Sequence, residues 1–146
     1  MSWLENLVVK LAGRVEKQID ALSDDKAFLA AQEAMAGGDH KTALAGFEAL
    51  AERNHPRAST LAGTMYLMGQ GTRENGGKAV KYLEIGKHAG DQEAVAMLGM
   101  MYAAGKAGVR VDYLKARPLL EAAAKNGDAK ARQMLAHVKA RQKGGR

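Results

Sequence analysis

The fold is decided by residues 94–128, AVAMLGMMYAAGKAGVRVDYLKARPLLEAAAKNGD. This stretch predicts a helix, a glycine-rich turn, a second helix and a closing Asn-Gly-Asp turn. Residues 58–91 repeat the same unit, because Gly63 and Gly99 are 36 positions apart and Lys78 and Lys115 are 37 apart. Self-similarity at this period is typical of a solenoid, in which each helix pair buries its apolar face against its neighbours.

The register continues in both directions. Upstream, a weaker copy aligns Phe47 with Leu83 and Asn54 with Gly90, and downstream only a first helix remains. We therefore expect a repeat array over 23–141 between two end segments. Its parts are an N-terminal amphipathic helix (1–22), a degenerate repeat (23–57), two full repeats (58–93 and 94–130), a capping helix (131–141) and a flexible basic tail (142–146).

The second full copy resembles the Sel1-like repeat, a relative of the tetratricopeptide repeat. The resemblance rests on Ala94, Leu98, Gly99, Tyr102, Gly105, Gly108, Val109, Asp112, Lys115, Ala116, Leu120, Ala123, Ala124, Gly127 and Asp128. The first copy departs from the pattern, with Ala62 in place of the usual leucine and Thr72 and Asn75 in place of the turn's Val and Asp. The resemblance implies an all-α, right-handed α-solenoid of helix pairs and a bacterial adaptor or scaffold protein.

Charge is distributed unevenly along the chain. The net charge is +6, and the chain up to Asp128 is neutral, with 16 basic and 16 acidic residues. The excess lies in Lys130, Arg132, Lys139, Arg141, Lys143 and Arg146. These cations suit the end of a solvated C-terminal helix, and they also leave open contact with an acidic partner or nucleic acid. A neutral body and the lack of a nucleic-acid module favour the first interpretation.

The sequence offers little for catalysis or cofactor binding. There is no cysteine, and none of the four histidines has a helical i, i+4 partner that would complete a metal pair. No serine lies in a nucleophile-elbow context, and Gly69-Gln70-Gly71 lacks the Gly-Lys-Ser/Thr of a phosphate loop. We therefore expect no enzymatic activity, no cofactor, no metal and no small-molecule substrate.

The first 22 residues predict an amphipathic helix with one apolar stripe: Leu4, Leu7, Val8, Leu11, Val15, Ile19 and Leu22. The run Leu7-Val8-Val9 is too short for a signal peptide or a membrane span, which favours a cytoplasmic protein. Three interpretations of the stripe remain open: a cap that packs on the helices of residues 24–53, a homodimer seam, or a helix that lies on a membrane with Trp3 at the interface. The protein is then a monomer or a weak homodimer.

Small residues and tyrosines recur at fixed positions inside the repeats. Gly63 and Gly99 each cost about 1 kcal/mol relative to Ala in mid-helix, so their recurrence predicts close approach of a neighbouring helix. Tyr66 and Tyr102 follow three positions later, and we expect them to fill the gap between helix pairs with their hydroxyls at the rim.

The remaining surface predicts the function. First helices of such pairs line the concave side of a solenoid, and we expect that side to bind another protein or peptide. The side chains predicted to line it are Thr60, Thr64, Leu67, Met68, Ala96, Met100 and Ala103. Methionine suits an adaptable binding surface. The predicted function is a protein–protein interaction scaffold, and the alternative is a basic nucleic-acid-associated protein that uses the C-terminal helix and tail.

Overall fold

A computed structural model describes residues 2–145 of the chain. Within this range the chain is helical and contains no strand. The helices are α1 (Trp3–Ala36), α2 (His40–Ala51), α3 (Pro56–Met68), α4 (Gly76–His88), α5 (Gln92–Ala104), the short 3₁₀ turn η1 (Lys106–Gly108), α6 (Tyr113–Lys125) and α7 (Ala129–Gly144).

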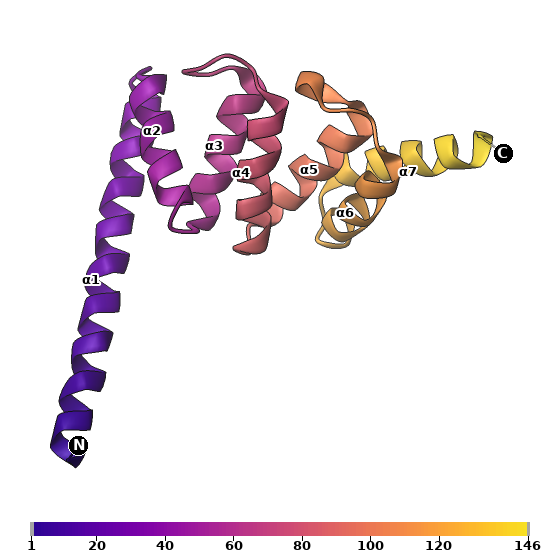
Figure 1. The fold of residues 1–146 in the computed structure, drawn as a ribbon. Helices are drawn as coiled ribbons and strands as arrows, with labels where there is room; N and C mark the ends of the chain where they lie inside the picture. Colours follow the sequence, from indigo (N-terminus) through magenta and orange to yellow (C-terminus); the bar gives the residue numbers. More distant parts are fainter. Residues whose placement is uncertain (1, 146) are drawn as a thin grey trace.

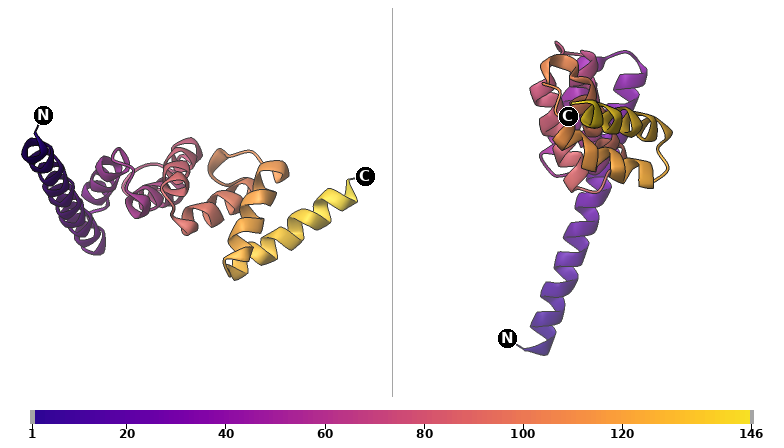
Figure 2. Two further views of the ribbon diagram at one scale, coloured as in Figure 1. Left: turned by 90° about the horizontal axis from the view of Figure 1, so that it is seen from below. Right: turned by 90° about the vertical axis from the view of Figure 1, so that its right-hand side faces the viewer.

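The helices stack as antiparallel pairs into an α-solenoid (Figure 1). The C-terminal part of α1 packs against α2, α3 pairs with α4, α5 pairs with α6, and α7 closes the array against α5 and α6. The predicted all-α solenoid is therefore confirmed. The views in Figure 2 show the stack as an elongated body from which α1 projects at one end.

Local sequence signals set the helix ends. The carboxylates of Asp112 and Asp128 accept hydrogen bonds from backbone N–H groups three residues later, at 3.0 and 2.9 Å. Such side-chain caps satisfy amides that have no partner within the helix. At the end of α2, Asn54 has φ 59°, the left-handed conformation that Gly90 and Gly127 adopt at the corresponding turns. The alignment of Asn54 with Gly90 thus matches the backbone.

The two repeated glycines allow the paired helices to interlock. A Cβ atom added at Gly63 would lie 2.7 Å from Leu83 Cγ on α4, and one added at Gly99 would lie 2.9 Å from Leu120 Cγ on α6. Both leucines are fully buried. The predicted close approach is confirmed, and it explains why glycine stands at these costly mid-helix positions.

Tyrosines fill the space between successive helix pairs. Tyr66 and Tyr82 form a stacked pair with ring centroids 5.6 Å apart, and both hydroxyls donate to the carboxylate of Glu48 on α2. Burial, together with this carboxylate, raises the pKa of each tyrosine to about 12. Tyr102 packs between the two halves of the core, with the Lys115 ammonium 5.3 Å from its ring. The predicted gap-filling role of Tyr66 and Tyr102 is confirmed.

The N-terminal helix differs from the prediction. The amphipathic helix was expected to end at residue 22 and the degenerate repeat to begin with a new helix at Ser23, but α1 runs without a break from Trp3 to Ala36. Asp24 instead pairs with Arg53 at 2.7 Å. Of the three interpretations of the stripe, a cap that packs on the helices of residues 24–53 is therefore wrong, because the continuous helix projects from the end of the array (Figure 1). All of residues 2–23 are exposed.

The C-terminal helix is also longer than expected. It was expected to end near Arg141 and to be followed by a flexible tail, but α7 continues to Gly144. The side-chain oxygen of Gln142 accepts a hydrogen bond of 3.1 Å from Arg117 on α6, which holds this last turn to the array. Arg146 lies outside the described residues.

Candidate partner-binding groove

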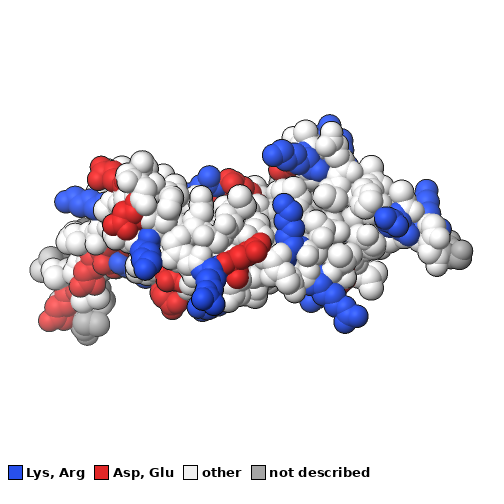
Figure 3. Space-filling model, turned by 90° about the horizontal axis from the view of Figure 1, so that it is seen from above, with Lys and Arg blue, Asp and Glu red and all other residues white. Residues whose placement is uncertain are grey.

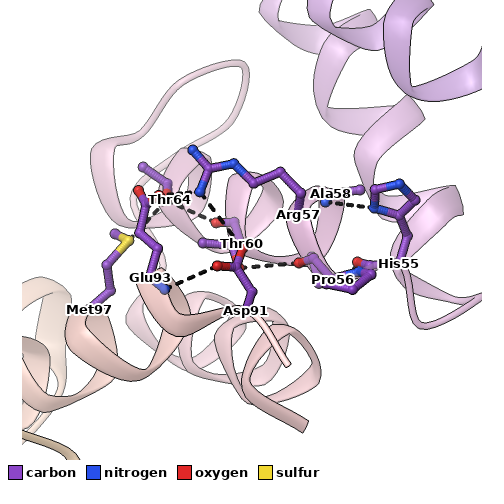
Figure 4. Close-up of polar contacts among 10 residues, drawn as sticks. His55, Pro56, Arg57, Ala58, Thr60, Thr64, Asp91, Glu93 and Met97 are labelled. Carbon is purple, nitrogen blue, oxygen red and sulfur yellow. Dashed lines mark hydrogen bonds and ion pairs between the residues drawn. The ribbon is translucent and has the colours of Figure 1, made fainter. Parts of the chain in front are cut away.

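Polar contacts join α3 to α5 on one side of the solenoid (Figure 4). The guanidinium of Arg57 binds the carboxylate of Glu93 and lies 3.7 Å from that of Asp91. The hydrogen bond to Glu93 raises the pKa of Arg57. Arg57 and Glu93 are 36 positions apart, so the same place in two successive repeats carries opposite charges. This pairing fixes one repeat against the next.

About two turns further along α3, the polar contacts give way to apolar ones. The hydroxyl of Thr64 donates to the carbonyl of Thr60 at 2.9 Å, and it lies 3.3 Å from the sulfur of Met97 on α5. The hydroxyl of Thr64 therefore contacts both its own helix and the sulfur of Met97, which places Thr64 at the border between α3 and the methionines of α5. The site therefore changes from a charged edge to a methionine-rich floor.

The floor consists of three adjoining clefts that share Met100. One cleft of about 180 Å³ is lined by Leu67, Met97, Met100, Met101, Ala104, Lys106 and Met134. The second, between α5 and α7, is lined by Met100, Lys130, Gln133, Met134 and His137. The third runs past Met97 and Met100 to the start of α7 and includes Ala96, Asp128 and Lys130. We call this surface the methionine groove and define it by Leu67, Met97, Met100, Met101 and Met134.

Three predicted contact residues lie beneath the surface. Thr60 is fully buried, because it packs under α4 where a Cβ atom on Gly86 would come within 2.5 Å of its hydroxyl. Ala96 and Ala103 are buried in the core cluster formed with α6 and α7. The expectation that Thr60 and Ala103 are displayed is wrong, because the neighbouring helices cover two sides of each first helix. Ala96 is buried to 3% exposure, yet it still lines the third cleft.

The other four predicted residues are accessible to differing degrees. Leu67 and Met100 line the groove, and Thr64 is half-buried beside it. Met68 is 66% exposed, yet its side chain lines none of the three clefts. The structure thus brings together Thr64, Leu67 and Met100.

Met97 and Met134 were missed by the sequence reasoning. They are 37 positions apart and occupy the same place in successive repeats, so the register contained the signal that both lie on one side. Residue type concealed it, because the equivalent residue of the preceding repeat is Leu61 and not a methionine. A search for methionine at equivalent repeat positions would have found the groove.

Positive charge borders the C-terminal side of the groove. Lys106 and Lys130 are exposed and line it, and Arg132, Lys139, Arg141 and Lys143 are exposed elsewhere on α7. Figure 3 shows one face on which Lys and Arg dominate the C-terminal side while Asp and Glu gather towards the N-terminal side. Asp128 is engaged as the cap of α7. The positive electrostatic potential at the C-terminal side of the groove therefore favours an acidic ligand.

The groove contains no group arranged for catalysis among the residues that the structure describes. No three His, Asp or Glu side chains within residues 2–145 lie close enough to hold a metal ion. His88 and Glu84 meet on α4 at 3.6 Å, but the His88 side chain is 75% exposed, as expected of a solvated pair. No helix in this part of the chain combines the length and apolar character needed to cross a membrane.

Comparison with known families identifies the repeats. The sequence profile of the Sel1 repeat matches residues 56–91 and 92–128, which run from the start of α3 through α4 and from α5 through α6. These two matches cover half of the chain, and the chain belongs to the Sel1-repeat proteins. Sel1-repeat proteins commonly act as protein–protein interaction scaffolds. No curated protein matches the sequence.

Solved structures share the fold. A protective antigen present in uropathogenic Escherichia coli strains, which has an SLR fold, superposes with a TM-score of 0.75 at 21% identity over 84% of this chain and 27% of its own. A Sel1 repeat protein from Oxalobacter formigenes gives 0.70 at 26% identity over 78% and 48%. Helicobacter pylori cysteine rich protein B gives 0.57 at 20% identity over 77% and 95%. The chain spans about a quarter and about half the length of the first two.

Proposed function

We propose that the protein is a small cytoplasmic adaptor that binds a segment of a partner protein in the methionine groove. The observation that carries the proposal is the position of Met100, whose side chain is common to three adjoining clefts. Flexible, polarizable methionine side chains adapt to different apolar ligands, and a row of them on one surface is a common feature of adaptable binding sites. No catalytic step is assigned to the site.

The lining of the groove defines the chemistry of its ligand. Leu67, Met97 and Met134 supply apolar contacts, and Lys106 and Lys130 stand at the borders. The ligand that fits is a peptide segment with two or three apolar anchors on one side and acidic residues beside them. Buried anchors supply most of the affinity in such complexes, and the charges accelerate association and select the partner.

The proposal is tested by selecting peptides from a random display library on the full chain and measuring their affinities by calorimetry. We expect selected peptides to combine apolar anchors with Asp or Glu. Met100→Lys should weaken their binding by at least about tenfold, because it removes an apolar floor and opposes apolar burial with a charge. Met68→Lys is the matched control, since that side chain lies outside the clefts, and it should leave the affinity unchanged.

A second control separates the groove from the exposed helix α1, whose apolar side chains also attract peptides. Val15→Glu alters that helix without touching the groove and should not change the affinities. Peptides that bind Met100→Lys as tightly as the wild type would refute the assignment. Loss of binding in Val15→Glu alone would place the ligand on α1 instead.

A further inference from the structure

The exposed part of α1 carries most of the exposed large hydrophobic side chains of the described chain. Nine of the large hydrophobic residues with exposed side chains lie on this helix: Trp3, Leu4, Leu7, Val8, Val9, Leu11, Val15, Ile19 and Leu22, with Leu29 further along. The side chain of Leu4 is 63% exposed and that of Leu22 is 58% exposed. A contiguous apolar surface of this kind on a soluble domain marks an interaction site.

The spacing of the apolar residues indicates what covers them. Alternating steps of four and three residues join Leu4, Val8, Leu11, Val15, Gln18 and Leu22. One step of four and one of three add up to seven residues, which is the heptad repeat of a coiled coil. Val8 and Val15 occupy one core position, called a, and Leu4 and Leu11 occupy the other, called d. In parallel coiled coils, β-branched residues at a with leucine at d favour an assembly of two helices.

We propose that α1 pairs with α1 of a second copy of this chain in a parallel, two-stranded coiled coil over residues 4–22. Gln18 is the single polar residue in the seam and faces its own copy, which fixes the register at some cost in stability. Asp25 is the next residue in the pattern, and two carboxylates would face each other there, so the seam ends at Leu22. This inference does not depend on the function proposed for the groove.

The rest of the structure leaves this surface free. α2 packs on a different side of α1, where Phe28 contacts Phe47 and Ala31 is buried. Leu29, which continues the seam side, is still 56% exposed. A second helix therefore reaches residues 4–22 without displacing any element of the repeat array, and the two arrays project from the same end of the coil.

The size of the interface predicts a weak dimer. The five apolar side chains of the seam and the flanking Leu7 and Ile19 of each helix, at roughly 70 Å² each, bury about 1,000 Å² in total. That area is near the lower limit for a specific interface, so we expect a dissociation constant in the micromolar range. The charges of the segment sum to zero, so neither strong repulsion between copies nor a preference for anionic lipid follows. They are Glu5, Glu16, Asp20, Lys10, Arg14 and Lys17.

The test is sedimentation equilibrium of the full chain from about 1 to 200 µM. We expect the wild type to approach twice the chain mass of 15.6 kDa. Val15→Glu should raise the dissociation constant by at least about tenfold, because it places two carboxylates in the seam. Val9→Glu makes the same substitution at a side chain that is 61% exposed but lies off the seam, and it should behave as the wild type does.

Orientation is tested with single cysteines, since the chain has none. Leu4→Cys should form a disulfide-linked dimer under mild oxidation, because the two d positions face each other in a parallel coil, and Val9→Cys should not. In an antiparallel coil Leu4 lies opposite Leu22 of the second helix. The two Leu4 positions are then about 27 Å apart along the coil. Failure of Leu4→Cys to cross-link would therefore overturn the parallel arrangement.

Three further results would overturn the proposal. The first is a wild type that stays monomeric at about 200 µM, and the second is a dimer that Val9→Glu weakens as much as Val15→Glu does. The third is monomeric protein that cosediments with vesicles of phosphatidylcholine and phosphatidylglycerol and is released by both substitutions. That outcome would assign the apolar surface to a membrane-lying helix.

Discussion

Replacing Gly63 by alanine tests whether the glycine sets the distance between α3 and α4. The added Cβ atom would lie 2.7 Å from Leu83 Cγ and 3.0 Å from the Ala79 carbonyl oxygen. Neither neighbour yields easily, because Leu83 is fully buried and the oxygen belongs to the backbone of α4. The helices must therefore separate, and overpacking of this kind costs about 1 to 3 kcal/mol.

A gain in helix propensity of about 1 kcal/mol opposes this cost, since alanine favours the helix over glycine. Contact with a backbone atom places the cost near the upper end of its range, so we expect a net destabilisation of about 1 to 2 kcal/mol. For a chain of this length that corresponds to a fall in melting temperature of about 3 to 6 °C. Thermal denaturation followed by circular dichroism measures it.

The matched control is Gly13→Ala. Gly13 lies inside α1, and among the described residues no heavy atom comes within 4 Å of the added Cβ atom. The same substitution there adds helix propensity without a clash and should not lower the melting temperature. The reasoning fails if Gly63→Ala is as stable as the wild type, or if both variants lose stability equally.

Three further predictions concern stability. Asn54→Ala should destabilise the fold by about 1 to 2 kcal/mol because φ is positive there, whereas Asn54→Gly should be neutral or stabilising in urea denaturation. The stacked pair Tyr66 and Tyr82, whose pKa values are raised to about 12, should contribute stability that is complete below pH 10 and is lost as the pH rises from 10 to 12; urea midpoints at pH 9 and 11 measure this loss. Arg57→Ala should cost less than about 1 kcal/mol in the same assay, and less still at high salt, because Arg57 and Glu93 are about half exposed.

The parts of the fold that follow from local chemistry could be predicted from the sequence. Two glycines at equivalent mid-helix positions are unfavourable unless a neighbouring helix needs the space, so Gly63 and Gly99 predicted the interlocking of the pairs. Asn54 tolerates the left-handed conformation better than most residues, so it marked a turn where the other repeats have glycine.

The predictions that failed concern the length of the N-terminal helix and the exposed sides of α3 and α5, which depend on contacts between distant residues. Ser23 and Asp24 have the chemistry of a helix start, but in an exposed helix they cost only a few tenths of a kcal/mol, and Asp24 gains an ion pair with Arg53. The sides of α3 and α5 that are covered depend on the rotation between successive repeats. For that reason Thr60 and Ala103 were wrongly expected at the surface, while Met97 was missed.

The central claim is that the methionine groove receives a peptide segment, and methyl NMR of the protein labelled with ¹³C at its methionine methyl groups tests it most directly. On titration with a selected peptide, we predict that the resonances of Met97, Met100 and Met134 shift together, while those of Met35 and Met68 stay in place. Shifts confined to Met35 or Met68, with Met97, Met100 and Met134 unchanged at saturating peptide, would contradict the assignment of the groove.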